Sequence, residues 1–440
     1  MTLRRNRKYR ALFAATTISN LGDGAATVAY PWLASAVTRN PLLVALVAVA
    51  QRLPWLVFTL PAGVITDRVD RRRAMVLMDT MRGVLTAVVA LAVLAEQHRL
   101  PGPGHTADVL GTRGGLYAAV LLATLLLGSA EVLRDNSGQT LMPSLVEPED
   151  LERANGRMWS VEGVMNTFLG PPIGALLIGA AFCLPFFFDA ASFFAAAALV
   201  AIIPGTFRVL RDETVPRPPW RAEMKEGIRW LWGHELLRPM AIILGLMNLA
   251  GMVCWATFVL FAQEVMHTSP FVFAVIGFGG AFGGIVGGQV ASSASKRFGS
   301  GTCLAFVLMG EAVLASLTGL IATWPAVMVL FTLESFLVLL WNVITVSLRQ
   351  SIIPPHLLGR VNSVYRFFAW GMGPIGAALG GLVVVVVDRF ASRGTALRAT
   401  WFVNAGIHLT LFLFGRAKLT TAKIEAARAE GTAALSGAPQ

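Results

Sequence analysis

The sequence predicts an all-α, multi-pass membrane protein with twelve transmembrane helices arranged as two pseudo-symmetric six-helix bundles. Hydrophobic residues make up 55% of the 440 residues and charged residues only 14%, whereas about a quarter of an average soluble domain is charged. A soluble fold could not cover so much apolar surface, so the excess must face lipid. The number of long apolar runs and a repeat between the two halves support the same fold.

Apolar runs long enough to cross a bilayer, about 20 residues each, occur along the whole chain. These runs are apolar at nearly every position rather than at alternate positions, which favours helices over the strands of a membrane barrel. We expect twelve spans, which start near Ala11, Leu42, Ala74, Leu116, Met158, Cys183, Met240, Phe271, Thr302, Ala326, Val364 and Leu397.

The basic residues predict the orientation of the spans. If the N-terminus is cytoplasmic, the inner segments carry most of the 36 Lys and Arg residues and the outer segments carry few. This bias follows the positive-inside rule and puts both termini in the cytoplasm, with the protein in the plasma (bacterial inner) membrane. Topology therefore explains the net charge of +11, and no nucleic-acid partner is expected.

The longest polar stretch divides the chain. We expect an N-terminal six-helix half at 1–205, a cytoplasmic central loop at 206–238, a C-terminal six-helix half at 239–416, and a largely disordered cytoplasmic tail at 417–440. Within the central loop, residues 220–232 are amphipathic and are expected to form a short helix at the membrane surface.

The two predicted halves are related in sequence. Pro-Ile-Gly-Ala at 172–175 in span five recurs at 374–377 in span eleven, and the spacing of Leu151 and Asn155 resembles that of residues 358 and 362. Several such matches in the same order indicate a duplicated six-span unit. A duplication of this kind is the physical basis of alternating access, in which one half rocks against the other.

The inner loop between spans two and three has a specific pattern: a glycine, an aspartate four residues later, and then a basic cluster. An ordinary basic turn is the simpler interpretation. The pattern also resembles the signature loop G-x-x-x-D-R-x-G-R-R of the major facilitator superfamily, with Asp70 in place of its second glycine. The resemblance implies the major facilitator fold and a conformational latch formed by Gly63, Asp67, Arg68, Arg71 and Arg72.

A second motif lies in span five. Gly170, Pro171 and Gly174 resemble the antiporter motif of the same superfamily, although a proline after a glycine can also kink a helix with no further purpose. With further matches in spans one and four and near Gln350, nearly the whole chain resembles the branch that contains macrolide exporters and the enterobactin exporter. This resemblance implies export of a drug or a siderophore.

Charged residues inside membrane spans are costly, so each is a functional candidate. Asp23 and Arg52 lie at similar heights, about 18 and 21 Å above the inner ends of spans one and two. We therefore expect an Asp23–Arg52 pair, which is either a static structural pair or a protonation-sensitive switch. Asp79 and Arg82, three residues apart, are expected to pair locally on span three.

Span four carries a cluster on one face, at 131, 134 and 135, and the family's fold implies that spans one, four, seven and ten line the cavity. A carboxylate that binds a proton in a closed cavity and releases it next to a cation would couple substrate export to proton entry. The candidate proton-coupling and cavity residues are Asp23, Arg52, Glu131, Arg134, Asp135 and Glu334.

Aromatic residues provide a candidate substrate surface. An apolar, aromatic cavity wall suits bulky amphipathic substrates, and packing against lipid is the alternative interpretation. The candidate wall residues are Trp255, Trp341, Phe367 and Trp370.

These patterns predict a monomeric secondary transporter that exports a small amphipathic molecule by proton antiport. An importer or a lysophospholipid flippase on the same fold is the alternative. A membrane-embedded enzyme is a distant one, because no HExxH or GxSxG motif is present. No cofactor or metal is expected, since the three cysteines are far apart in apolar runs and no phosphate-binding GxxxxGK[ST] loop occurs.

Overall fold

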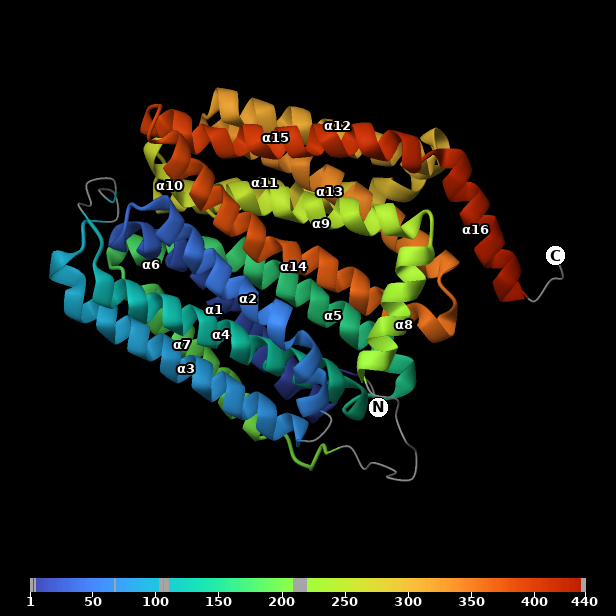
Figure 1. Ribbon diagram of the computed structural model, residues 1–440. Helices are drawn as coiled ribbons and strands as arrows, with labels where there is room; N and C mark the ends of the chain where they lie inside the picture. The colour runs from blue at the N-terminus through green and yellow to red at the C-terminus, as the bar shows by residue number, and fades with distance from the viewer. Residues whose placement is uncertain are drawn as a thin grey trace. The chain divides into compact units, whose positions relative to one another are not determined.

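The structure of the protein, a computed structural model, describes residues 3, 5–66, 69–102, 106, 111–208 and 220–436. In this part of the chain the regular structure is helical, apart from one isolated β-bridge between Thr38 and Thr112 (Figure 1). The helices group into two compact units.

The first unit contains Met1–Asp212 together with Ala262–Val275. In this unit α3 packs against α4 and α7, α1 packs against α6 and α7, and α2 packs against α4 (Figure 1). Its helices are α1 (Arg7–Val37), α2 (Pro41–Thr66), α3 (Arg71–Glu96), α4 (Gly114–Leu141), α5 (Leu151–Gly163), α6 (Gly170–Ala180) and α7 (Leu184–Ala201), with 3-10 turns at Gln97–Arg99, Met142–Ser144 and Pro148–Asp150 and a π-helical turn at Val164–Leu169.

The second unit contains Glu213–Phe261 and Ile276–Gln440. In this unit α9 packs against α14 and α15, α12 packs against α13 and α15, and α8 packs against α14. Its helices are α8 (Trp220–Gly233), α9 (Leu237–Trp255), α10 (Phe258–Glu264), α11 (Pro270–Phe298), α12 (Ser300–Ile321), α13 (Trp324–Ile352), α14 (Pro355–Val387), α15 (Arg393–Lys418) and α16 (Thr421–Ser436), of which α10 and α11 continue into the first unit.

The units do not follow the order of the chain everywhere. Residues 262–275 group with the first unit, although the sequence assigns them to the C-terminal half. The predicted halves 1–205 and 239–416 divide the chain by connectivity, and they stay predictions.

Eleven helical stretches in the described part of the chain are long and apolar enough to cross a membrane. They correspond to the second to twelfth predicted spans. The first predicted span is α1, which is 31 residues long but has a lower mean hydropathy because it carries Thr16, Thr17, Ser19, Asn20 and Asp23. The chain is a multi-pass membrane protein.

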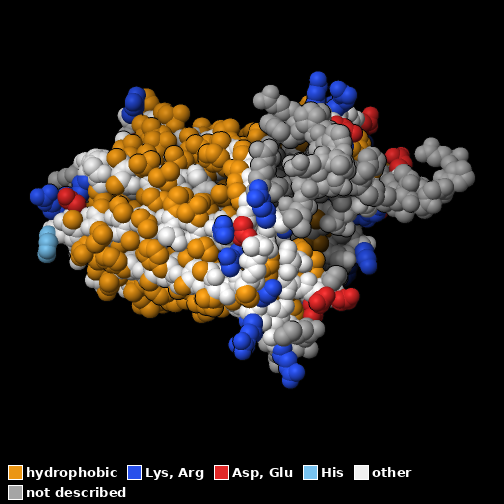
Figure 2. All heavy atoms as spheres, turned by 90° about the horizontal axis from the view of Figure 1, so that it is seen from below, with side chains coloured by type: hydrophobic (Ala, Val, Ile, Leu, Met, Phe, Trp, Pro, Cys, Tyr) orange, Lys and Arg blue, Asp and Glu red, His pale blue; other side chains and the backbone are white. Residues whose placement is uncertain are grey.

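Helix α3 illustrates why these helices belong in lipid. Leu77, Val84, Val88 and Leu91 follow one another at helical spacing and are 50–63% exposed. The opposite face buries the charged Asp79. A helix that exposes apolar residues and buries charge has the polarity expected against lipid. Figure 2 shows the same arrangement on one face of the molecule, where hydrophobic side chains cover a broad area and Lys and Arg gather mainly at its margins.

The break between α5 and α6 follows from two adjacent prolines. Pro171 and Pro172 have no N–H groups, so the carbonyls one turn earlier lack their usual helical donors. The chain responds with the π-helical turn at Val164–Leu169, in which the N–H of Gly170 donates to the carbonyl oxygen of Met165, five residues earlier. Such π-helical turns often occur at functional sites.

The repeated Pro-Ile-Gly-Ala sequence has the same packing role in each unit. A Cβ atom on Gly174 would lie 2.3 Å from the carbonyl oxygen of Ala25 in α1. At the equivalent place in the repeat, a Cβ atom on Gly376 would lie 2.2 Å from the carbonyl oxygen of Leu249 in α9. Only glycine allows backbones to approach so closely, as in other membrane helix pairs. The repeat therefore preserves a close helix crossing, α1 with α6 and α9 with α14.

The structure differs from the largely disordered tail expected at 417–440. Helix α16 covers Thr421–Ser436, because the segment is rich in alanine, the best helix former, and its start is anchored. Leu419 and Ile424 are 2% and 0% exposed within the core of the second unit, and the backbone N–H of Gly301 donates to Thr421 Oγ1 at 3.2 Å.

Candidate functional site

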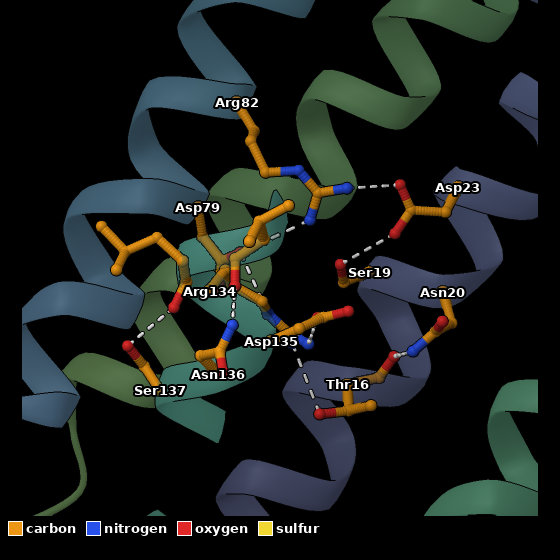
Figure 3. Close-up of polar contacts among 12 residues, drawn as sticks. Thr16, Ser19, Asn20, Asp23, Asp79, Arg82, Arg134, Asp135, Asn136 and Ser137 are labelled. Carbon is orange, nitrogen blue, oxygen red and sulfur yellow. Dashed lines mark hydrogen bonds and ion pairs between the residues drawn. The ribbon is translucent and has the colours of Figure 1, made fainter. Parts of the chain in front are cut away.

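A network of buried charges joins three helices of the first unit (Figure 3). The guanidinium of Arg82 on α3 lies 2.6 Å from the Asp23 carboxylate on α1 and 3.9 Å from Asp79, one turn earlier on α3. Arg134 on α4 lies 3.4 Å from Asp79 and 3.5 Å from Asp135. Asp79 is thus shared by two arginines and connects α3 to α4, while Arg82 connects α3 to α1.

The members of this network differ in exposure. The side chain of Asp79 is 0% exposed and that of Arg82 is 4% exposed, whereas the side chain of Asp23 is 32% exposed. The Arg82 guanidinium also lies over the ring of Phe193 on α7, 4.0 Å from its centroid, a cation–π contact. Arg82 is therefore fixed from three sides, and Asp23 is the more exposed member of the pair.

The partner of Asp23 is Arg82, so the predicted Asp23–Arg52 pair is wrong. Depth in the membrane does not identify the partner of Asp23, because Arg82 lies at a depth similar to that of Arg52. It is about 11 residues, or roughly 17 Å, above the start of α3. Arg52 on α2 interacts electrostatically with Glu131 on α4 instead. The predicted pair of Asp79 and Arg82 is present at 3.9 Å, but it forms part of a network rather than an isolated surface pair.

Three residues that are absent from the predicted site belong to this network or lie near it. Arg82 is the central base, Asp79 is the shared acid, and Asp189 on α7 is 2% exposed and interacts electrostatically with Arg82. All three are charged residues inside predicted spans, and that signal alone would have included them. Glu131 also interacts with Arg82. The structure therefore brings the predicted acids Asp23, Glu131 and Asp135 together around Arg82 and the predicted Arg134.

Polar side chains extend the network along α1 toward the π-helical turn. Ser19 Oγ donates to Asp23 at 3.4 Å, and Arg134 donates to Thr16 Oγ1 at 3.4 Å (Figure 3). Asn166 in the π-helical turn donates its amide to Asn20 at 2.7 Å. The α1 face that carries Asp23 is thus linked by hydrogen bonds to the break between α5 and α6.

The predicted antiporter residues lie at a close contact between α1 and α6. A Cβ atom on Gly170 would lie 2.5 Å from the Cα atom of Gly24 in α1, the residue after Asp23. Pro171 and Gly174 are buried at the same crossing. A packing role is therefore present at this motif, and any role in antiport stays a proposal.

Asp67 and Arg68 of the predicted latch loop lie outside the described residues, and Gly63 lies within α2. Arg71 donates to the carbonyl oxygen of Thr140 at 2.7 Å. Arg72 donates to the carbonyl oxygen of Ile203 at 2.7 Å, so the basic cluster ties the start of α3 to the ends of α4 and α7.

Asp70, the departure from the family pattern, has a clear structural role. It is the N-cap of α3 and accepts from the backbone N–H of Arg73 at 2.9 Å and of Phe207 at 2.7 Å. Burial alone would raise the pKa of Asp70, but these two donors and the nearby Arg72 and Arg73 hold its pKa below the ordinary value. The carboxylate form is thus stabilised at the helix N-terminus.

In the second unit, three of the four candidate wall residues are open to their surroundings. Trp255, Phe367 and Trp370 are 52–54% exposed. Trp341 is 1% exposed within the hydrophobic core of its unit, so its prediction as a wall residue is wrong. A tryptophan is equally hydrophobic in a cavity wall and in a packed core, so its residue type does not distinguish the two. Only the neighbouring side chains determine which of them it occupies.

Among the described residues, no group of three or more His, Cys, Asp and Glu side chains is placed to hold a metal ion. The polar chemistry of the first unit consists of carboxylates held by arginines. Such groups can exchange protons and bind charged or polar molecules.

Long membrane helices in two units, a repeated glycine crossing and buried charges are typical of secondary transporters. The family described as transmembrane secretion effectors, part of the major facilitator superfamily, matches residues 2–432, and the chain belongs to it. The multidrug efflux pump Tap of Mycolicibacterium fortuitum is 26% identical over 385 residues, which cover 84% of this chain and 87% of the pump.

The enterobactin exporter EntS of Shigella boydii serotype 4 is 25% identical over 426 residues, which cover 95% of each chain. The crystal structure of a bacterial homologue of the iron transporter ferroportin superposes with a TM-score of 0.70 at 16% identity, covering 94% of this chain and all of that one. The resemblance to the major facilitator superfamily and its exporter branch is confirmed. The chain is a transporter of small molecules and not an enzyme.

Proposed function

We propose that this transporter exports a small amphipathic molecule of the drug or siderophore class by proton antiport with alternating access. The efflux pump Tap and the exporter EntS align with this chain over nearly its whole length. This similarity supports the proposed outward direction of transport and the proposed substrate class. We further propose that the protein is a monomer in the bacterial inner membrane. Because the basic residues follow the positive-inside rule, we place both termini in the cytoplasm and expect no nucleic-acid partner.

The observation that carries the coupling proposal is the Asp23–Arg82 pair. Arg82 is buried and fixed by Asp79 and Phe193, while Asp23 is one-third exposed. When Asp23 takes up a proton, the attraction between its carboxylate and Arg82 is lost, and α1 is released from α3. When the proton leaves, the pair forms again. Proton binding at Asp23 therefore changes the contact between two helices.

Glu131, Arg134 and Asp135 act with Asp23 in this proposal. Glu131 interacts with both Arg82 and Arg52, so it responds to the loss of charge at Asp23. The loop residues Gly63, Asp67, Arg68, Arg71 and Arg72 are the proposed latch, supported by the contacts of Arg71 and Arg72 across α3, α4 and α7.

A transport experiment tests the proposal. A panel of antibiotics and siderophores is first screened for compounds that a strain expressing the protein tolerates better than a deletion strain. The purified protein is then reconstituted into proteoliposomes, and flux of the compound found in the screen is measured with and without a pH gradient. We expect flux that requires the gradient, with D23N abolishing the pH dependence and the exposed-site control Asp388→Asn retaining it.

Two outcomes would contradict this mechanism. Gradient-driven export that persists undiminished in both D23N and the double variant E131Q/D135N would exclude the proposed coupling residues. Flux of the wild-type protein that does not respond to a pH gradient would exclude proton antiport and favour passive flipping.

A further inference from the structure

Helices α8 and α9 meet at a short joint (Figure 1), and a histidine lies in it. His234 is half-buried and stands between Gly233, the last residue of α8, and Leu237, the first residue of α9. Its ring nitrogen Nδ1 accepts from the backbone N–H groups of Leu236 at 3.2 Å and of Leu237 at 3.3 Å. The first N–H groups of a helix have no partner within that helix, so the imidazole caps the N-terminus of α9.

The same side chain is held by α8. The ring centroid of His234 lies 5.3 Å from that of Trp230, which packs against the hydrophobic core that contains the buried Leu231. The backbone N–H of His234 donates to the carbonyl oxygen of Leu231 at 3.3 Å. One histidine thus connects the end of α8 to the start of α9, a helix long and apolar enough to cross the membrane.

Only the neutral imidazole can form this cap. Nδ1 must keep its lone pair in order to accept, and the tautomer with its proton on Nε2 does so. Protonation of Nδ1 turns a donor toward two other donors and puts a positive charge at the positive end of the helix dipole. Burial adds to this preference and holds the pKa of His234 below its ordinary value, although the carboxylates of Glu430 and Glu235 act in the opposite direction.

The charged groups around the imidazole come from α9, α16 and the joint itself. Glu430 lies on α16 and Glu235 follows His234 in the chain, and both are exposed. Arg238, in the first turn of α9, donates to the carbonyl oxygen of Trp232 at 3.3 Å. Among the described side chains, the two carboxylates are the charges that act on the ring. The protonated ring therefore loses two backbone partners on α9 and is attracted to a carboxylate on α16.

We propose that His234 is an acid-sensitive switch at the joint between α8 and α9. At neutral pH the uncharged ring caps α9 and rests against Trp230, which joins the two helices. In acid the imidazolium gives up the two N–H groups of α9 and pairs with Glu430 on α16, so the start of a membrane-spanning helix is released. In the proposed orientation this joint is cytoplasmic, on the side where a proton antiporter delivers its protons. The switch itself depends neither on the direction of transport nor on Asp23.

Amide hydrogen exchange in the full-length purified protein tests the switch. The protection factors of the Leu236 and Leu237 amides, which correct for the pH dependence of the intrinsic exchange rate, are followed from about pH 7.5 to about pH 4.5, across and below the ordinary pKa of histidine. We expect both factors to fall by about fivefold to tenfold in acid, because each N–H loses its acceptor.

Matched variants separate the titration of His234 from other effects of acid. An asparagine side chain caps a helix without titrating, so H234N should keep its protection across the pH range, whereas H234A should lack it throughout. The exposed control His98→Asn, in the first unit, should respond to acid like the wild-type protein. E430Q should shift the midpoint of the change to lower pH, because the carboxylate that favours the imidazolium is removed.

Thermal unfolding identifies any variant that fails to fold and provides a second readout. Since the pKa of His234 is lowered in the folded protein, the cap stabilises the fold above about pH 6.5 and this contribution is lost as the pH falls through the lower pKa. The deficit of H234A should therefore shrink in acid. Wild-type protection that does not change with pH, or that falls equally in H234N, would overturn the proposal. A midpoint that E430Q leaves unchanged would overturn the pairing with α16.

Discussion

The role of a charged residue in this protein depends on the side chains around it and not on its residue type alone. Asp23 and Asp79 are both carboxylates on membrane helices and both pair with Arg82. Asp79 is fully buried between two arginines, whereas Asp23 is one-third exposed. This difference is the reason why we propose Asp23, and not Asp79, as the residue that exchanges a proton.

Arg82 should be the side chain in the first unit whose loss is most damaging. The variant R82M leaves the buried carboxylate of Asp79 with Arg134 only, and breaking a buried ion pair costs about 3–5 kcal/mol. Thermal unfolding in detergent should show this loss. R82M/D79N should recover part of it, because the excess buried charge is also removed. Arg99→Gln, at a side chain 73% exposed, is the control. A loss in R82M no larger than in the control would disprove the structural role of the network.

The cap at Asp70 predicts a pH-dependent stability. Since the folded protein holds the pKa of Asp70 below its ordinary value, the carboxylate stabilises the fold above about pH 4. This contribution is lost as the pH falls through the lower pKa of the folded state. D70A should lose about 1 kcal/mol at neutral pH, and the difference from the wild-type protein should shrink in acid.

Asn is also a good cap and does not titrate, so Asp70→Asn is the matched control. Its unfolding temperature should stay closer to that of the wild-type protein at neutral pH than that of D70A. A D70A deficit that is the same at pH 7 and pH 3 would show that the carboxylate charge contributes nothing.

At the scale of elements, the repeated glycine determines how closely two helices approach in each unit. The crossings of α1 with α6 and of α9 with α14 depend on Gly174 and Gly376, respectively. The π-helical turn precedes the first of these crossings and links to α1 through Asn166 and Asn20. Movement of α1 after protonation of Asp23 would therefore be transmitted to the α5–α6 break.

Helix α6 contains its own control for this packing argument. G174A places a methyl group 2.3 Å from the Ala25 carbonyl oxygen, so α1 and α6 must separate, at a cost of about 1–3 kcal/mol. G179A meets nothing within 4 Å and should be neutral or slightly stabilising, because alanine favours helix more than glycine. Unfolding temperature and transport rate should both fall in G174A alone. Equal effects of the two variants would show that the close crossing is not needed.

At the scale of the molecule, the sequence predicts those features that depend on the local composition of the chain. The helical spans, the duplication and the family follow from apolar runs and motifs, and Gly170, Pro171 and Gly174 were found at a true helix crossing. Lateral neighbours were not predictable, because Arg52 and Arg82 lie at similar depths and only packing selects Arg82 as the partner of Asp23. For the same reason Trp341 was mistaken for a wall residue.

The grouping of residues 262–275 with the first unit has no counterpart in the sequence, and it leads to a prediction for the whole molecule. Gln263 donates to Ser35 Oγ at 2.9 Å and accepts from Arg39 at 2.6 Å, and Arg39 also pairs with Glu264. These contacts attach the segment to the end of α1. In the proposed alternating access the segment would exchange these partners, so the polar contacts should control how often it is released.

R39Q should therefore raise amide hydrogen exchange in 265–275 by about tenfold, which corresponds to about 1.4 kcal/mol of lost protection. The N–H of Thr268, which donates to the carbonyl oxygen of Ala262 at 2.9 Å, is a suitable reporter. The charge swap R39E/E264R should restore protection, because the ion pair is re-formed with opposite polarity. Arg113→Gln is the control, since Arg113 pairs with Glu96 outside this segment. If R39Q and the control exchange alike, the segment is held by its apolar contacts, such as the Trp32–Phe273 ring pair at 5.5 Å, and not by the charges.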